Sequence, residues 1–300
     1  MAVTEGTVSF RGHRTWYRSV GNGRAGRPPL LVVAGGPGCP HDYLNDLAAL
    51  YEETGRQVVF YDQIGCGRSD HPDDPALWTM STFVDELAAV RAALGLDPVH
   101  VLGHSWGSQI ALEYVLTRPV GLAGLVLAGP IASAPAYQAE TRRLKDSLPG
   151  DVRETLDRHE AAGTTDDPEY QAAAMAFHQR WLCRLDPWPA HLVRSFTSIR
   201  PDVYEALWGG TEWNLTGSLK DWDVTGRLGE IDLPVLVTSG RHDVATPALV
   251  RPLAEGIRGA EWVVFEESAH IPSAEEPGRY RRVLADFLAA ADPAPVARAA

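Results

Sequence analysis

The chain has 300 residues, and its content of 45% hydrophobic and 22% charged residues is ordinary for a folded globular protein and argues against disorder. Asp and Glu outnumber Lys and Arg by 39 to 27, which gives a formal net charge of −12. An acidic chain binds polyanions poorly, so neither nucleic acid nor an anionic membrane is expected as a partner.

The cysteines and the N-terminal residues bear on the compartment. Three cysteines with no C-x-x-C pair predict neither a disulfide framework nor a zinc site. The first residues lack the apolar core of a secretory signal, and no window approaches the roughly eighteen apolar residues of a membrane span. We therefore expect a cytoplasmic protein, as a monomer or a small homo-oligomer.

Short apolar or alternating runs predict the strands. Residues 6–10 and 15–20 are two extended segments, and the turn-like Arg11-Gly12-His13 between them predicts a hairpin. Six further runs have the length and apolar character of strands: 30–34, 57–61, 99–102, 124–128, 233–238 and 261–265.

Helical patterns lie between these strands. In residues 82–94 the apolar side chains recur on one helical face, with Ser81 as the expected N-cap and Gly95 just beyond the last turn. Three other stretches are expected to be helical: 109–116, 247–257 and 278–290. The alternation of strands and helices predicts a parallel sheet with helices on both faces. The tail from residue 292 is expected to fray.

The middle of the chain has no strand signal. Between about residues 133 and 216 helical stretches dominate, at 139–148, 152–162 and 169–183. Five of the nine tryptophans fall between positions 181 and 222, and we expect them to pack this region, with some of them lining a ligand pocket. The chain is therefore interpreted as an α/β core formed by residues 1–133 and 217–300, with a helical cap inserted at 134–216.

The strongest local motif is Gly103-His104-Ser105-Trp106-Gly107, which fits the G-x-S-x-G pattern of a nucleophile elbow. It follows a predicted strand and precedes a predicted helix, which is the context that the motif requires. The serine then lies on a strained turn, and the glycines two residues to either side avoid steric collision. We predict that Ser105 is a nucleophile at the positive end of the following helix. The alternative is a serine in a tight glycine turn without a catalytic role.

A serine nucleophile needs a base, and in this architecture the acid and the base follow in the order Ser, Asp, His. Asp243 lies just past the run 233–238, and His270 lies just past the run 261–265. Both are at carboxyl ends of predicted strands, where α/β sheets gather ligand sites. We predict that His270 shuttles the proton and that Asp243 orients the imidazole. His104 is adjacent to the nucleophile, so its side chain is expected to project away and to be structural.

A glycine-rich loop, Ala34-Gly35-Gly36-Pro37-Gly38, ends the first core strand. Glycines permit a close approach of the backbone, and Pro37 stiffens the loop. Such a loop can direct a backbone N–H at an oxyanion, with the N–H of Trp106 as its partner. A plain turn after the strand is the alternative.

Together these motifs resemble the proline iminopeptidase family of α/β-hydrolases, which are serine aminopeptidases. The family loop H-G-G-P-G is similar to residues 34–38, its D-Q-x-G-x-G-x-S motif to residues 62–69 and its G-x-S-W-G-S motif to residues 103–108. A family stretch like N-E-F-x-x-x-G-x-x-x-D-W-D is similar to residues 211–223. The resemblance covers nearly the whole chain, most loosely at 134–205, and implies the α/β-hydrolase fold with an inserted helical cap.

The resemblance also implies roles for individual residues. Ser105, Asp243 and His270 correspond to the family's catalytic triad, and the N–H groups of Gly36 and Trp106 correspond to its oxyanion donors.

On the substrate side, the resemblance implies that Glu212 in the cap binds the free α-amino group, because an ammonium in an apolar cleft needs an anionic partner. A solvated surface acid is the alternative for this residue. Gly35, Trp213 and Trp181 are further candidates for substrate contact. No metal ion or organic cofactor is implied.

Two positions depart from the family pattern: Ala34 replaces the histidine that heads the glycine loop, and Val244 follows Asp243 where better-known members have a second glutamate. The sequence predicts a serine hydrolase that cleaves an amide bond next to an N-terminal residue, as an aminopeptidase or amino-acid amidase, through an acyl-enzyme. The substrate is expected to be a short peptide or a small molecule. An esterase or lactonase that needs no free amine is the second interpretation, which Val244 favours, and a binding protein without turnover is the third.

Overall fold

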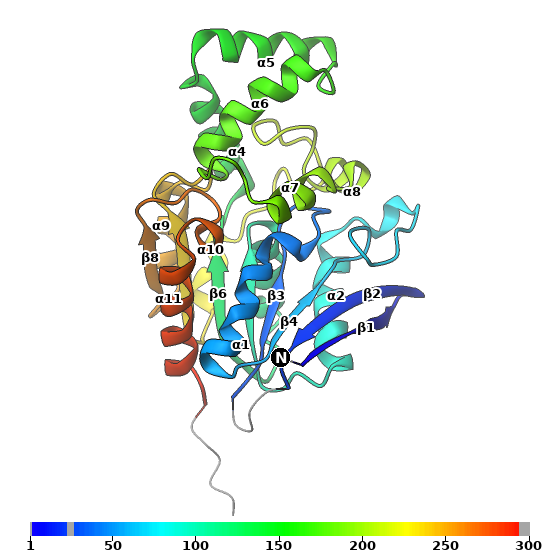
Figure 1. The fold of residues 1–300 in the computed structure, drawn as a ribbon, viewed down its shortest axis with the longest axis vertical. Coiled ribbons are helices and arrows are strands. Elements are labelled where there is room, and N and C mark those ends of the chain that lie inside the picture. Colours follow the sequence, from blue (N-terminus) through cyan, green and yellow to red (C-terminus); the bar gives the residue numbers. More distant parts are fainter. Residues whose placement is uncertain (1, 23–26, 294–300) are drawn as a thin grey trace, which may run out of the picture.

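The computed structural model describes residues 2–22 and 27–293, which form one sheet covered by helices (Figure 1). The sheet order is β1-β2-β4-β3-β5-β6-β7-β8. The first two strands pair antiparallel, β2 pairs antiparallel with β4, and the strands from β4 to β8 are parallel. The bounds of the strands are β1 Val3–Phe10, β2 His13–Val20, β3 Leu30–Val33, β4 Val58–Tyr61, β5 Val99–His104, β6 Leu122–Ala128, β7 Val235–Gly240 and β8 Glu261–Phe265.

Helices connect the parallel strands. In chain order they are η1 His41–Ala48, α1 Ala49–Thr54, η2 Pro75–Leu77, α2 Met80–Ala93, α3 Trp106–Leu116, α4 Ala134–Asp146, α5 Gly150–Ala162, α6 Pro168–Trp181, α7 Ala190–Thr197, α8 Pro201–Leu207, η3 Thr225–Glu230, α9 Pro247–Gly256, α10 Pro272–Glu275 and α11 Pro277–Ala290. Among the described residues, no helix has the length and apolar character needed to cross a membrane.

Each face of the sheet packs against its own set of helices. One apolar cluster buries Phe83 and Leu87 of α2 and Ile110 of α3, and a second cluster on the other face buries Leu50 of α1 and Leu284 of α11. Figure 1 shows α1 and α11 in front of the sheet and α2 behind it. Because the central strands are covered on both sides, they are continuously apolar, as in LLVV of β3 and VVFY of β4. The predicted parallel sheet between two helical layers is confirmed.

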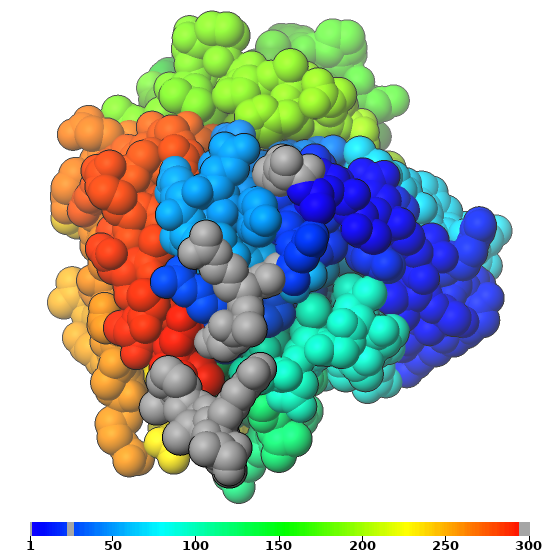
Figure 2. All heavy atoms as spheres, turned by 60° about the horizontal axis from the view of Figure 1, so that its bottom comes forward, coloured from blue at the N-terminus to red at the C-terminus, as the bar shows by residue number. Residues whose placement is uncertain are grey.

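The five helices α4 to α8 occupy the long connection between β6 and β7. They lie above the carboxyl ends of the parallel strands (Figure 1), and in the space-filling view this green region forms a layer along the top of the molecule (Figure 2). All five lie within the segment 134–216 that the sequence suggests as a cap.

The structure departs from the sequence prediction at some helix ends. The N-cap of α2 is Thr79 and not Ser81, because Thr79 has an extended backbone and its hydroxyl accepts a hydrogen bond from the N–H of Thr82. Gly95 follows the last turn with a φ of +63°, as predicted. Helix α3 begins directly after Ser105 rather than at residue 109. Of the tail expected to fray, residues 294–300 lie outside the described residues.

Candidate active site

Ser105 lies on a sharp turn between β5 and α3, with φ +54° and ψ −123°. A positive φ is uncommon outside glycine and marks the strained backbone expected of a nucleophile elbow. A Cβ added to Gly103 would lie 2.2 Å from the carbonyl oxygen of Gly107, and one added to Gly107 would lie 2.2 Å from that of Val33. Both glycines are therefore required for the turn to form.

Two loops bring His270 and Asp243 together at the carboxyl ends of β8 and β7. The Nδ1 atom of His270 lies 2.6 Å from Oδ1 of Asp243, which is fully buried. The backbone N–H of Ala245 donates to the same carboxylate at 2.7 Å. A carboxylate can only accept, so Nδ1 of the neutral imidazole carries the proton and Nε2 is left with a free lone pair.

Charge around His270 favours its protonated form. Burial lowers the pKa of the imidazole, but the Asp243 carboxylate, by its charge and its hydrogen bond, raises it more, and the charges of Glu212 and Glu275 add to the increase. The net result is a pKa above the ordinary value of 6.5. The ring is thus a stronger base than a free histidine.

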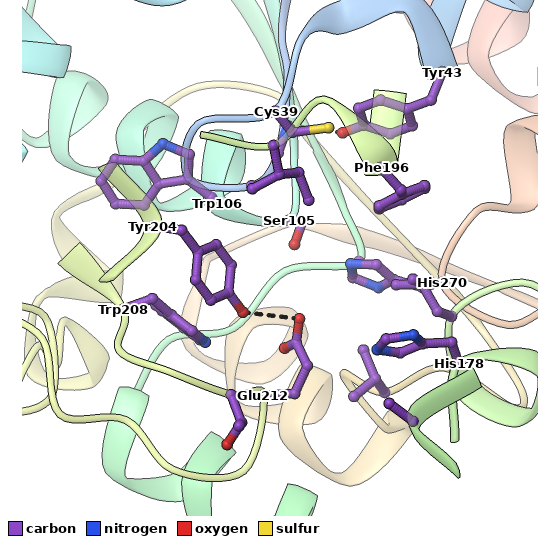
Figure 3. A pocket seen from close by; sticks show the side chains of 18 of the residues that line it. Cys39, Tyr43, Ser105, Trp106, His178, Phe196, Tyr204, Trp208, Glu212 and His270 are labelled. Carbon is purple, nitrogen blue, oxygen red and sulfur yellow. Dashed lines mark hydrogen bonds between the residues drawn. The ribbon is translucent and has the colours of Figure 1, made fainter. Parts of the chain in front are cut away.

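Ser105 and His270 line one cavity of about 550 Å³, and Figure 3 shows their side chains on the same wall. Among the described residues no hydrogen bond joins the Ser105 hydroxyl to the imidazole, and such contacts often tighten only in the substrate complex. A hydroxyl and an imidazole held by a buried carboxylate can perform nucleophilic acyl transfer.

The glycine loop lies against the elbow. A Cβ on Gly35 would be 3.0 Å from Cβ of Ser105, and Gly36 has a φ of +119°. Gly35, Gly36 and Trp106 all line the cavity. The N–H of Gly35 donates to the Tyr43 hydroxyl at 2.7 Å and is therefore engaged within the protein. The N–H groups of Gly36 and Trp106 therefore remain our prediction for the oxyanion donors.

Glu212 faces the same cavity from the region between β6 and β7. The Tyr137 hydroxyl of α4 donates to its Oε2 at 2.7 Å, and the Tyr204 hydroxyl of α8 donates to its Oε1 at 3.1 Å, a bond drawn in Figure 3. Burial, reinforced by the nearby carboxylate, holds the pKa of both phenols well above 10, so both remain donors. Two fixed donors orient the carboxylate toward the cavity, where it can receive an ammonium group.

The two predicted substrate-binding tryptophans have different positions. Trp213 is buried, lines the cavity and donates from Nε1 to the Glu160 carboxylate at 2.7 Å. Trp181 is absent from the cavity wall: its ring packs against Phe177, and its carbonyl accepts from the N–H of Val244 at 2.9 Å. Trp188 and Trp208 from the same region do line the cavity.

Glu275 supports the His270 loop and has no counterpart among the sequence predictions. Its carboxylate accepts from the N–H groups on either side of His270, those of Ala269 at 3.0 Å and Ile271 at 3.2 Å, and from that of Arg184 at 2.8 Å. Burial raises the pKa of Glu275. In the sequence, the signal that could have indicated this role is the position of Glu275 five residues after His270.

The described part of the chain contains two clusters of potential metal ligands, and both are already paired with cations of the protein. In the group of His41, Asp42 and Asp62, the guanidinium of Arg68 lies 2.9 Å from Asp42 and 3.3 Å from Asp62. In the group of His159, Asp167 and Glu169, the guanidinium of Arg158 lies 2.7 Å from Glu169.

Comparison with known proteins identifies the family. The profile of the α/β-hydrolase fold family matches residues 28–277. A proline iminopeptidase of Heyndrickxia coagulans is 41% identical over 286 residues, which cover 95% of this chain and 98% of that protein. A proline iminopeptidase of Levilactobacillus brevis is 37% identical, with 97% and 98% covered.

Solved structures of similar sequence also share the fold of this chain. The proline iminopeptidase of Mycobacterium smegmatis superposes with a TM-score of 0.89 at 39% identity, covering 96% of this chain and 99% of that one. The crystal structure of VinJ superposes with a TM-score of 0.92 at 41% identity, with 96% and 98% covered. The resemblance predicted from the motifs is confirmed, as is the assignment to hydrolytic enzymes. This chain belongs to the α/β-hydrolase family and, within it, to the proline iminopeptidases.

Proposed function

We propose that this protein is a serine hydrolase that cleaves the amide bond following an N-terminal residue with a free amine, as an aminopeptidase or amino-acid amidase. The observation that carries the proposal is one cavity lined by both Ser105 with His270 and the carboxylate of Glu212. A nucleophile and an ammonium site in one cavity suit a short peptide or an amino-acid amide as substrate.

In the proposed reaction, His270 Nε2 takes the proton of Ser105 as the hydroxyl oxygen bonds to the substrate carbonyl carbon. The N–H groups of Gly36 and Trp106 receive the oxyanion. When the tetrahedral intermediate collapses, the C–N bond breaks and the imidazolium gives its proton to the departing amine. Water then attacks the acyl-enzyme, His270 takes a proton from it, and the acid leaves as Ser105 recovers its proton. Asp243 keeps the imidazole in the required tautomer.

Substitution of Ser105 tests the nucleophile. Ser105→Ala is expected to lose turnover and labelling by a fluorophosphonate probe while it keeps the fold. Full activity of the folded variant would overturn the assignment.

Glu212 is tested by comparing amino-acid anilides with their N-acylated analogues. A charge-assisted hydrogen bond contributes about 1.5–3 kcal/mol, so Glu212→Gln should lower kcat/KM for the free-amine anilide by roughly 10- to 150-fold. The N-acylated analogue should be affected far less. Glu205→Gln is the matched control, because Glu205 lines the same cavity and is exposed. An unchanged preference for the free amine in Glu212→Gln would refute the amine-anchoring role.

The second candidate is an esterase or lactonase without need of a free amine. It is favoured by Val244, which is buried in the cavity wall directly after Asp243 and leaves Glu212 without a second glutamate at that position. A panel of p-nitrophenyl esters beside the aminoacyl anilides separates the two activities: higher kcat/KM for esters lacking an amine would favour this candidate.

We also propose a cytoplasmic location, which the three free and buried cysteines support, since secreted proteins more often pair them. The predicted state is a monomer or a small homo-oligomer.

A further inference from the structure

The peptide unit between Ala34 and Gly35 is hydrogen-bonded at both ends by buried side chains. Its carbonyl oxygen accepts from Nε2 of Gln63 at 2.8 Å, and its N–H donates to the Tyr43 hydroxyl at 2.7 Å. Gln63 is 1% exposed and Tyr43 is 2% exposed. The next residue along the chain is Gly36, the proposed oxyanion donor.

Each of these two side chains is also bonded to a neighbour of Ser105. Oε1 of Gln63 accepts from the indole Nε1 of Trp106 at 2.9 Å. The Tyr43 hydroxyl lies 2.7 Å from Nδ1 of His104. The residues immediately before and after the nucleophile are thus joined, through one intermediary each, to the two ends of a single peptide plane.

The direction of each hydrogen bond follows from its partners. Nε2 of His104 lies 2.9 Å from the carbonyl oxygen of His270, which can only accept, so Nε2 carries the proton and Nδ1 is an acceptor. Burial lowers the pKa of His104 to about 3, so the ring is neutral at working pH. The Tyr43 hydroxyl must then donate to His104 and accept from Gly35. Gln63 has one orientation that satisfies both the indole N–H and the Ala34 carbonyl.

The glycine loop needs such support because glycines restrict the backbone least. Gly36 and Gly38 both have positive φ, of +119° and +75°. Without fixation the loop would sample other conformations, and a displacement of about 1 Å in a catalytic group can reduce the rate by about 100-fold.

We infer that Gln63 and Tyr43 are positioning residues that clamp the Ala34–Gly35 peptide and thereby hold the Gly36 N–H in register with Ser105. The inference rests on the proposed function, since it needs an oxyanion to stabilise. Gln63 is absent from the cavity wall, and Tyr43 lines the wall with its hydroxyl engaged by Gly35 and His104. We therefore expect both side chains to act on the chemical step rather than on binding.

Tyr43→Phe and Gln63→Met test the clamp. Each is expected to lower kcat by about 10- to 100-fold, part of the 100- to 1000-fold effect of losing one oxyanion donor, with KM changed by less than about threefold. Tyr61→Phe is the matched control, because the Tyr61 hydroxyl is buried without a hydrogen-bond partner among the described residues. It should keep wild-type kcat.

The double variant distinguishes a shared action from general damage. Because both residues act through the same N–H, the loss in kcat of the double variant should stay below the product of the two single losses and should not exceed about 1000-fold. If instead the losses multiply and KM rises with them, the residues act independently and the clamp is refuted.

Folding is checked by circular dichroism and thermal unfolding. Should Gln63→Met fail to fold, Gln63→Glu keeps the length and the acceptor for Trp106 and removes the donor to Ala34, so it carries the same expected loss in kcat. Folded variants with kcat within twofold of wild type, beside an inactive Ser105→Ala, would overturn the clamp and leave the proposed function standing. An active Ser105→Ala would overturn the proposed function itself.

Discussion

Glu86 of α2 offers a quantitative test of how burial changes the pH dependence of stability. Its carboxyl group has 0% exposure, and no described Lys, Arg or His side chain pairs with it. The Thr15 hydroxyl and the N–H of Ile64, at 2.9 Å, donate to it. Burial raises its pKa from 4.5 to about 8, and the hydrogen bonds from Thr15 and Ile64 offset only part of this. At neutral pH the folded protein therefore holds Glu86 protonated.

The direction in which pH changes the stability follows from the number of protons bound by the folded and unfolded states. Between pH 4.5 and 8 the folded state holds this proton while the unfolded state has released it, so the contribution of Glu86 favours folding at low pH and is lost as pH rises through 8. From pH 6 to the folded-state pKa of about 8, the free energy of unfolding falls by about 1.36 kcal/mol per pH unit, or roughly 3 kcal/mol in total. From pH 8 to 9 this contribution changes little. Glu86→Gln cannot titrate, so it should avoid this loss.

We expect the difference in free energy of unfolding between Glu86→Gln and the wild type to shift in favour of the variant by roughly 3 kcal/mol between pH 6 and pH 9. Urea unfolding at pH 6, 7, 8 and 9 measures both curves. Glu255→Gln, an exposed position in α9, is the control and should run parallel to wild type. Parallel curves for Glu86→Gln would refute the reasoning.

Three further predictions concern the site and its frame. Since the pKa of His270 is raised and the base must be neutral, kcat/KM should fall on the acid side with a midpoint above pH 6.5; a midpoint below this value in the pH profile would contradict the Asp243 pairing. Gly107→Ala places a Cβ 2.2 Å from a backbone carbonyl oxygen and should lower the free energy of unfolding by about 3 kcal/mol or more. Gly150→Ala, where the added Cβ has no atom within 4 Å, is the control and should leave the free energy of unfolding unchanged or raise it by up to about 1 kcal/mol. Equal melting temperatures of the two variants would argue against this. Glu275→Ala leaves the N–H groups beside His270 without their acceptor and should lower stability by about 2 kcal/mol and reduce kcat, with partial recovery in Glu275→Gln; wild-type kcat in the alanine variant would rule out a role in positioning.

The strands and the chemistry-bearing loops were predictable from local patterns. Apolar runs such as LLVV mark strands buried on both faces, and parallel strands bring their carboxyl ends to one edge. Ser105, Asp243 and His270 each follow such a run, so their meeting at that edge follows from topology. The position of Glu212 came from the family resemblance, and no periodicity would have indicated it.

The supporting contacts were not predictable in this way. Tyr43 meets His104 across 61 positions of sequence, and Trp106 meets Gln63 across 43. Such pairs depend on side-chain geometry after the chain has folded, which no local pattern encodes. The same limit explains Trp181, whose aromatic character fits a pocket but whose ring packs against Phe177.

The carboxylate of Glu212 is held by hydroxyls from α4 and α8, whereas Ser105 and His270 follow β5 and β8. In the proposed function, bond cleavage and amine recognition therefore depend on separate segments of the chain. Substitutions in the helices between β6 and β7 can therefore change which acyl group is accepted without altering Ser105, Asp243 or His270. One sheet with its Ser, His and Asp side chains can in this way accept different substrates after a few substitutions in the inserted helices.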